Sequence, residues 1–278
     1  MTQYQSRGTM QPAFVLHTRP YRNTSLLVDI FTPESGIVGA VARGARRRQS
    51  RMRGLMQPFR ALLVSWFGRG DLVTLTAAED QGPPLWFTGH VLASAFYMNE
   101  LLLRLLQRHD SHPALYRRYE QTLGRLAALD MSPAADPGRG LQQVLRLYEK
   151  FLLQELGYGL VLDREVQSGA AIEPDQRYHY YHDRGPVAVT AGDQRQVREP
   201  ADGRDSGGVP VTGRTLMGLA GDALDQPAML KEAKHLMRHL LEIHLGAKPL
   251  GSRALIDVYG QHAAGARPPA VPDTEQAS

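Results

Sequence analysis

The sequence predicts an α+β fold in which a small N-terminal β-barrel precedes an all-helical domain with a β-hairpin insertion. Between residues 13 and 78, short runs of apolar residues alternate with polar ones, which is typical of strands. From residue 90 onward, apolar residues recur every three or four positions, as on the buried face of a helix. A polar stretch between residues 163 and 210 interrupts the helical pattern.

The N-terminal part contains five strand-like runs. Val28 and Ile30 alternate with Asp29 and Phe31, and glycines near residues 36 and 70 supply connections that suit hairpins. An open sheet leaves edges that pair with other chains, so five short strands predict closure into an SH3-like or OB-type barrel. The runs cover residues 13–20, 25–36, 37–46, 61–70 and 71–79, within a barrel domain of residues 1–85.

Three helices are expected after the barrel. The first spans residues 90–109, and Pro113 is a favoured first-turn residue for the second. A linker rich in proline and glycine at 130–140 separates the second helix from the third. The third helix is expected to begin near Leu141 and to stop at Gly157.

The C-terminal part combines a polar insertion with two further helices. A strand-like patch at 178–190 predicts a hairpin, whereas residues 191–210 have almost no large apolar side chain to offset the entropy of ordering, so we expect flexibility there. Thr212 is a candidate N-cap for the next helix. The predicted divisions are a first helical part at 86–162, a hairpin and flexible insertion at 163–210, a second helical part at 211–262 and a disordered tail at 263–278.

Composition excludes several classes of protein. The 278 residues are 42% hydrophobic and 22% charged, which is ordinary for a globular protein, and they include no cysteine. Disulfides and thiolate metal sites are therefore excluded. No run reaches the ~18 uninterrupted apolar residues of a membrane span, and the first residues lack the pattern of a signal peptide. We expect a cytoplasmic protein that needs no cofactor.

Positive charge is concentrated between residues 35 and 70. This segment has eight arginines and no Asp or Glu, and subtracting its +8 from the total of +4 leaves −4 on the other 242 residues. Such a concentration attracts polyanions, and phosphate is the expected partner, although a solvated basic loop is the alternative. We expect a mobile loop after the third run to carry most contacts. The candidate contacts are Arg19, Arg22, Arg43, Arg46, Arg47, Arg48, Arg51, Arg53 and Arg69.

Aromatic residues beside these arginines are candidate stacking platforms for bases. Phe59 and Phe67 are expected in the barrel core, because alternating aromatics in a small barrel usually pack inside. Trp66 remains open between core and stacking, and we include it among the candidate contacts. Tyr21 is either a groove residue or a cap of the barrel.

Motifs of several enzyme classes are missing from the sequence. It contains no Walker A motif, no GxGxxG after a strand and no GxSxG elbow. The sequence therefore lacks the motifs that an ATPase, a dehydrogenase or a hydrolase needs. His235 and His239 have the spacing of two metal ligands on a helix, but without HExxH a solvent-facing helix explains them better. No candidate catalytic residue emerges.

Four segments carry a resemblance to a known family. Residues 13–75, from AFVLHTRPYRNTS to DLVTL, resemble the N-terminal domain of the RecO family of bacterial DNA repair proteins. YMNELLLRLL at 97–106, LGYG at 156–159 and KPLGSRALI at 248–256 are similar to segments of the same family, in the same order. The resemblance covers most of the chain outside the polar insertion and the tail.

The resemblance implies an N-terminal OB-fold, a helical C-terminal domain and a role as a recombination mediator of the RecF pathway without catalytic turnover. It implies binding to single- and double-stranded DNA and annealing of strands coated with single-stranded DNA-binding protein (SSB). RecR is an implied partner, RecA an indirect one, and the implied location is cytoplasmic, on the nucleoid during repair. A nuclease or other DNA-processing enzyme with an OB docking domain, or an RNA-binding OB protein, is the alternative.

One departure from the family concerns metal. Many members carry two CxxC pairs between the LGY segment and the last helices, whereas this chain offers only His179 and His182 there. Without thiolates or a second ligand pair we expect no zinc site, so the hairpin has to be stable without a metal ion.

The implied SSB contact needs an apolar pocket beside a cation, because the SSB tail ends in an acidic, aromatic-tipped segment. The expected helices supply both. Arg146 is the first choice, since it matches a basic position beside an aromatic in the family's helix, and Arg117, Arg118 and Arg125 are expected to point outward from the second helix.

Overall fold

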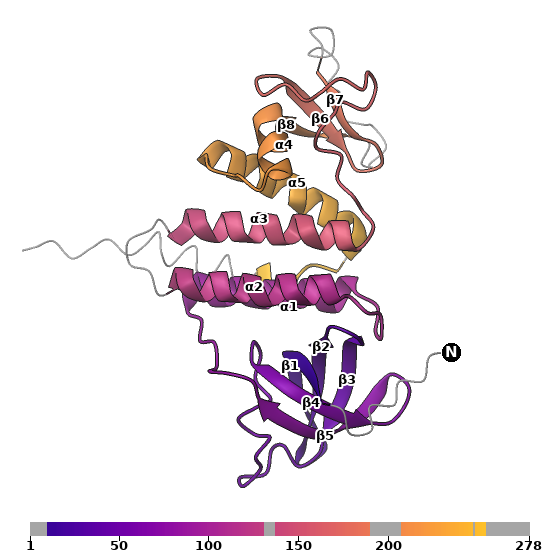
Figure 1. The fold of residues 1–278 in the computed structure, drawn as a ribbon, viewed down its shortest axis with the longest axis vertical. Coiled ribbons are helices and arrows are strands. Elements are labelled where there is room, and N and C mark those ends of the chain that lie inside the picture. Colours follow the sequence, from indigo (N-terminus) through magenta and orange to yellow (C-terminus); the bar gives the residue numbers. More distant parts are fainter. Residues whose placement is uncertain (1–9, 131–136, 190–206, 247, 254–278) are drawn as a thin grey trace, which may run out of the picture.

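The structure, a computed structural model, describes residues 10–130, 137–189, 207–246 and 248–253. A small barrel lies at one end, helices form layers in the middle and a small sheet lies at the far end (Figure 1). The predicted α+β architecture is therefore confirmed. Most of the segment expected to be flexible, and the whole expected tail, lie outside the described residues.

The barrel is closed and has the strand order β1-β2-β3-β5-β4, with β4 paired back to β1. The β3–β5 pair is parallel and the other pairs are antiparallel. This is the five-stranded Greek-key arrangement of an OB-fold, so the barrel left open between two types is an OB-type barrel. The strands are β1 (Gln11–Tyr21), β2 (Ser25–Thr32), β3 (Gly36–Ala42), β4 (Ala61–Phe67) and β5 (Leu72–Asp80).

The helices stack in layers, with one helix enclosed between the others. Figure 1 shows α3 between the layer of α1 and α2 and the layer of α4 and α5. All seven residues from 144 to 150 are buried, because both sides of α3 are covered. The helices are α1 (Gly89–Leu105), α2 (Pro113–Asp130), α3 (Pro137–Glu155), α4 (Gly213–Ala220) and α5 (Pro227–Leu245).

The observed start and end of α3 can be compared with the predicted start near Leu141 and the predicted stop at Gly157. The helix begins at Pro137, so residues 137–140, expected in the linker, form its first turn. Gly157, the predicted stop, has φ of 85°. Its N–H donates to the Gln154 carbonyl at 3.0 Å, and the N–H of Tyr158 donates to the Leu153 carbonyl at 2.9 Å. This pair of bonds is a Schellman motif, and the prediction is confirmed.

The predicted hairpin is part of a three-stranded sheet in the order β7-β6-β8. Strands β6 (Arg177–Tyr181) and β7 (Gly185–Ala188) form the hairpin, and β8 (Val209–Thr212) pairs with β6 from the other side. The expectation of flexibility is therefore wrong at Val209 and Pro210. Val211 is buried against the helical domain, and that burial offsets the cost of ordering the strand.

Two carboxylates hold the insertion and its neighbouring helix. Glu165 accepts hydrogen bonds from the N–H of Gln167 at 2.9 Å and from the hydroxyl and N–H of Ser168, and these bonds hold the pKa of Glu165 below its ordinary value. Thr212 is the N-cap of α4, as predicted, but its hydroxyl donates to Glu232 at 2.7 Å rather than capping the helix. Side-chain hydrogen bonds thus stabilise a region for which we expected no metal.

The barrel docks on the helices through aromatic side chains on its outer surface. Phe14 and Phe31 point away from the barrel interior and pack against Tyr116 and Tyr119 of α2, with ring centroids 5.3 to 6.0 Å apart. Tilted and edge-to-face pairs at such distances are favourable. All four residues 13–16 of β1 are buried, because one face of the strand fills the barrel and the other packs against the helical domain.

A buried hydrogen-bond chain fixes this contact. The Asn99 amide of α1 donates to the Leu16 carbonyl of β1 at 2.8 Å, and the Tyr119 hydroxyl donates to Asn99 Oδ1 at 2.5 Å. Both side chains are almost fully buried, so each bond replaces contact with water that the interface excludes.

We expect Tyr119→Phe to lower the free energy of unfolding by about 1–3 kcal/mol, because it leaves Asn99 Oδ1 buried without its donor. Urea denaturation measures the change. The matched control is Tyr158→Phe, which should alter stability by less than about 0.5 kcal/mol, because Tyr158 is 47% exposed. Equal effects of the two substitutions would contradict the role given to the buried hydroxyl.

Candidate nucleic-acid interface

Six of the predicted arginines project from the connection between β3 and β4, residues 43–60, which we call the arginine loop. Where a mobile loop was expected, the structure has successive turns, closed by bonds such as Arg47 N–H to the Gly44 carbonyl at 2.9 Å. Ala45 and Met56 are buried in the barrel core. The arginine side chains therefore project from a folded loop that is anchored in the barrel. Arg43, Arg46, Arg47, Arg48, Arg51 and Arg53 are all exposed.

The arginine loop is joined to the turn between β1 and β2. Arg46 donates its backbone N–H to the Thr24 carbonyl at 2.9 Å and its guanidinium to the Arg22 carbonyl at 3.4 Å. Arg22 itself lies 5.2 Å from the centroid of the Tyr21 ring. The structure thus brings Tyr21, Arg22 and the arginine loop together, although more than 20 residues separate them in the sequence.

Arg60 differs from the other arginines of the segment. Its guanidinium pairs with both carboxylate oxygens of Asp80 and donates to the Gly54 carbonyl at 2.6 Å. The hydrogen bond from Arg60 lowers the pKa of the Asp80 carboxyl, so the two charges cancel. Within the described part of the chain, the six exposed arginines of the loop and Arg69 form no ion pair with a carboxylate, and their charge remains available to a ligand.

The structure decides the positions of two neighbouring aromatics, Trp66 and Phe67. Trp66 is 2% exposed and lies in the barrel core, so it is not a stacking platform, whereas Phe67, expected in the core, is 52% exposed. The reason is strand parity, since Leu62, Val64 and Trp66 share the inward face of β4. The alternation of residues 62, 64 and 66 in the sequence could therefore have predicted that Trp66 points inward and Phe67 outward. Phe59 is buried, but outside the barrel core where it was expected, because it packs with Phe87 and Phe96 in the helical cluster.

Phe67 belongs to a row of outward side chains across the barrel, which we call the open row. Register pairs connect its members from one strand to the next, and residues directly opposite each other share a face of the sheet. The turn between β4 and β5, with exposed Arg69, and the turn between β1 and β2 lie near this row. These are the surfaces that OB-folds use for oligonucleotides. The row contains Arg19, Leu27, Val41, Thr74 and Phe67.

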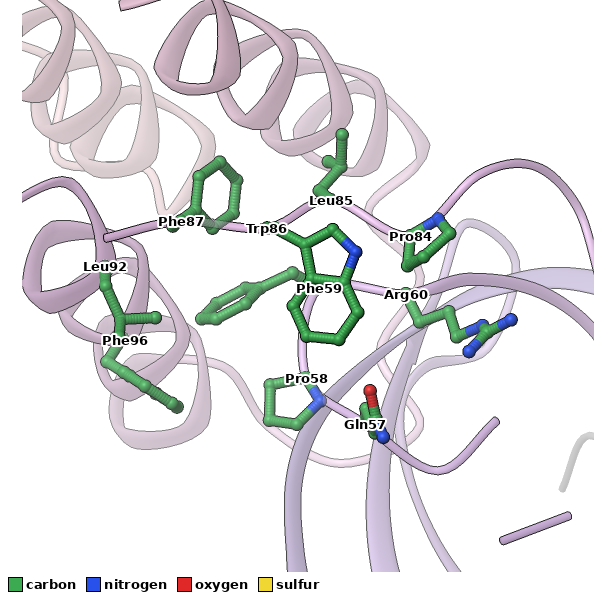
Figure 2. A pocket seen from close by; sticks show the side chains of 10 residues that line it. All are labelled: Gln57, Pro58, Phe59, Arg60, Pro84, Leu85, Trp86, Phe87, Leu92 and Phe96. Atoms are coloured by element: carbon green, nitrogen blue, oxygen red, sulfur yellow. The ribbon is translucent and has the colours of Figure 1, made fainter. Parts of the chain in front are cut away.

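An apolar groove of about 370 Å³ lies at the end of the arginine loop, where the barrel meets the linker to α1. Figure 2 shows Phe59, Phe87 and Phe96 around it, and Phe59 packs edge-to-face on the other two rings at 5.3 and 5.0 Å. Trp86 lies over the groove and is 72% exposed. We did not single out this tryptophan from the sequence, because it lies between the predicted strands and helices.

The helical arginines divide into two groups. Arg117 and Arg125 are exposed on α2, and Arg118 lies over the Phe151 ring at 4.5 Å. Arg146, our first choice for the SSB tail, is 6% exposed and pairs with the fully buried Glu149 at 2.9 Å. Because α3 is covered on both sides, its guanidinium does not face solvent, and we withdraw Arg146 as a surface contact.

The described residues lack the features of two other kinds of site. No three His, Asp or Glu side chains come together there as a metal site. In the same residues, no helix is both long and apolar enough to cross a membrane. His244, on the last helix, stacks on Tyr158 with centroids 3.6 Å apart.

Similarity to known proteins covers nearly the whole chain. Residues 7–83 match the family model described as Recombination protein O N terminal, and residues 87–254 match that described as Recombination protein O C terminal. The DNA repair protein RecO of Nitrosococcus oceani is 48% identical over 90% of this chain and 94% of its own length. RecO of Thiobacillus denitrificans is 45% identical over 90% and 92%, and that of Coxiella burnetii 40% over 90% and 98%.

We expect Phe67→Ala to weaken binding of single-stranded DNA by about 1–3 kcal/mol, the usual value of one stacked base, and to leave the protein folded. Fluorescence anisotropy with a labelled oligonucleotide measures the affinity, and a thermal melt measures the stability. Phe67→Trp keeps an aromatic face and should retain the affinity. If Phe67→Ala binds like the wild-type protein, the open row does not stack bases through Phe67.

Proposed function

Because the chain belongs to the RecO family of DNA repair proteins, we propose that it is a recombination mediator of the RecF pathway. In this role it binds single- and double-stranded DNA without reading sequence and anneals complementary strands coated with SSB. With RecR it helps to load RecA. The proposal includes no catalytic step and places the protein in the cytoplasm, on the nucleoid during repair.

The observation that carries the proposal is the group of exposed guanidiniums beside the open row that form no ion pair with a carboxylate among the described residues. Exposed arginines that lack carboxylate partners displace the counterions condensed on a polyanion, and this release drives association with any sequence. Arginine also stacks on bases and binds phosphate with two donors. The open row supplies Phe67 for a base, while the arginine loop supplies charge for the backbone.

Annealing sets limits on how the strands are held. Two strands repel each other, and a protein that neutralises both lowers that repulsion. The bases must still be free to exchange partners, so tight readout of base edges would hinder the search. Contacts made through charge and stacking meet both needs, because they are strong in sum and tolerant of position.

We place the SSB tail on the outer face of α2. Arg117 and Arg125 are exposed there, and Arg118 lies beside the ring of Phe151, so cations stand next to an aromatic surface. An acidic tail with an apolar tip requires this combination. The assignment rests on the chemistry of this face, with Arg146 left out.

We expect the combined substitution of Arg46, Arg47 and Arg48 by Ala to flatten the plot of log affinity against log salt concentration. The slope should change by about 0.7 to 1 for each lost phosphate contact. Titrations of DNA at several salt concentrations measure it. The control replaces Arg117 and Arg125 by Ala and should keep the wild-type slope, and an unchanged slope in the triple variant would refute the assignment of the loop.

The proposed function is tested by annealing of complementary strands precoated with SSB from the same cell. We expect the protein to accelerate pairing, and the acceleration to fall when the SSB lacks its tail, because the protein is then no longer recruited. Failure to pair matching strands even at low salt would refute the mediator role. Metal-dependent DNA cleavage, or tighter binding of RNA than of DNA at matched salt, would favour the alternatives.

A further inference from the structure

A second row of outward side chains lies between the open row and the interface with the helices; we call it the middle row. Register pairs join His17 to Asp29, Asp29 to Gly39 and Gly39 to Leu72. It is two residues along each strand from the open row, a step of about 7 Å. On its other side, Phe31 is already covered by α2. The middle row is therefore the border of the exposed face.

Arg108 reaches this border from the helical domain. Arg108 lies in the connection between α1 and α2. This connection is fixed on the barrel by an isolated β-bridge between Arg108 and Ile37 and by the hydrogen bond from His109 N–H to the Ile37 carbonyl at 3.1 Å. Ser111 adds a hydrogen bond to the Pro33 carbonyl at 3.1 Å. The backbone that carries Arg108 is thus held in place on the β2–β3 hairpin.

The guanidinium of Arg108 lies on β3 because position 39 has no side chain. A Cβ on Gly39 would lie 2.4 Å from Arg108 Nη1, and 2.8 Å from the Asp71 carbonyl. Any other residue at this position would displace the guanidinium. Gly39 therefore provides the space in which a cation from one domain lies against a strand of the other.

Asp29 neutralises this cation. Arg108 Nη2 donates to Asp29 Oδ1 at 2.6 Å, and His17 Nδ1 lies 3.7 Å from Asp29 Oδ2. Asp29 is the sole acidic residue in the sequences of strands β1, β2 and β3. Asp29 lies beside the face of the barrel for which the proposed function requires positive charge. The Arg108 side chain remains 42% exposed despite the ion pair.

We propose that Arg108 is a phosphodiester-binding residue for a DNA strand on the open row, and that Asp29 weakens this contact by neutralising its charge. The inference rests on the proposed function. A phosphate at the middle row meets attraction from Arg108 and repulsion from Asp29, so the pair adds little net attraction. The effect is a looser grip at the border of the DNA-binding face, which suits strands that must exchange partners.

An ion pair that only fastens the two domains is the competing explanation, and charge substitutions separate the two. Asp29→Asn removes the charge but keeps an oxygen that accepts from Arg108, so the fastening bond persists. Arg108→Gln leaves the carboxylate uncompensated on the DNA-binding face. A fastening pair predicts lower stability of Arg108→Gln with unchanged DNA affinity of both variants, whereas our proposal predicts opposite changes in affinity for the two variants.

The experiment measures binding of a labelled oligo-dT to the full chain at several salt concentrations. We expect Asp29→Asn to bind about threefold to tenfold more tightly at ~0.1 M salt, with a slope steeper by about 0.7, the value for one more phosphate contact on a single strand. Arg108→Gln should bind more weakly. The double variant should return close to wild type, because the middle row again has no net charge.

Glu79→Gln is the matched control, since Glu79 is exposed on β5 and its substitution changes the net charge by the same amount. Thermal melts confirm that every variant is folded. If Asp29→Asn binds no more tightly than Glu79→Gln, the inference is overturned, while DNA binding and annealing by the wild-type protein leave the proposed function standing. If the wild-type protein itself binds no DNA, the proposed function fails and this inference fails with it.

Discussion

The aromatic contact between the barrel and α2 is the constraint on which the rest of the arrangement depends. Phe14 and Phe31, on the outer surface of β1 and β2, are covered by Tyr116 and Tyr119 of α2. The hydrogen bond from Asn99 to the Leu16 carbonyl fixes this docking. A small barrel of this kind has a limited outer surface. Burying one part of it against helices decides which part remains for a ligand.

Charge is distributed according to the same division. Where the barrel meets the linker, Arg60 is neutralised by Asp80, and at the border of the helical interface Arg108 is neutralised by Asp29. The six exposed arginines of the arginine loop form no ion pair with a carboxylate among the described residues. A basic segment in the sequence thus becomes, in the fold, a set of available cations separated from paired ones.

Enclosure of α3 explains the ionic groups inside the helical domain. Arg146 and Glu149 pair with each other, and Tyr97 donates its hydroxyl to Glu149 at 2.7 Å. Lys150 binds the Leu219 carbonyl at 2.6 Å and the carboxylate of Asp222. Burial raises the pKa of the Glu149 carboxyl, and the charge of Arg146 opposes that rise. Pairing of this kind makes buried charges tolerable, and it removes Arg146 from the surface available to partners.

The sequence by itself determined the features that arise from local periodicity and composition. Alternation placed Val28 and Ile30 in the barrel, helical spacing placed α1 to α3, Gly157 ended a helix, and the lack of acids marked the arginine loop. Only the tertiary structure decided which charges are free, because Arg60 and Arg108 meet their carboxylates through long-range packing. Arg146 pairs with Glu149 on its own helix, but the layers on both sides of α3 bury the pair. Strand β8 likewise needed its neighbour β6 to become ordered. Local patterns record the face that a residue presents, whereas the partner on that face depends on segments far away in the chain.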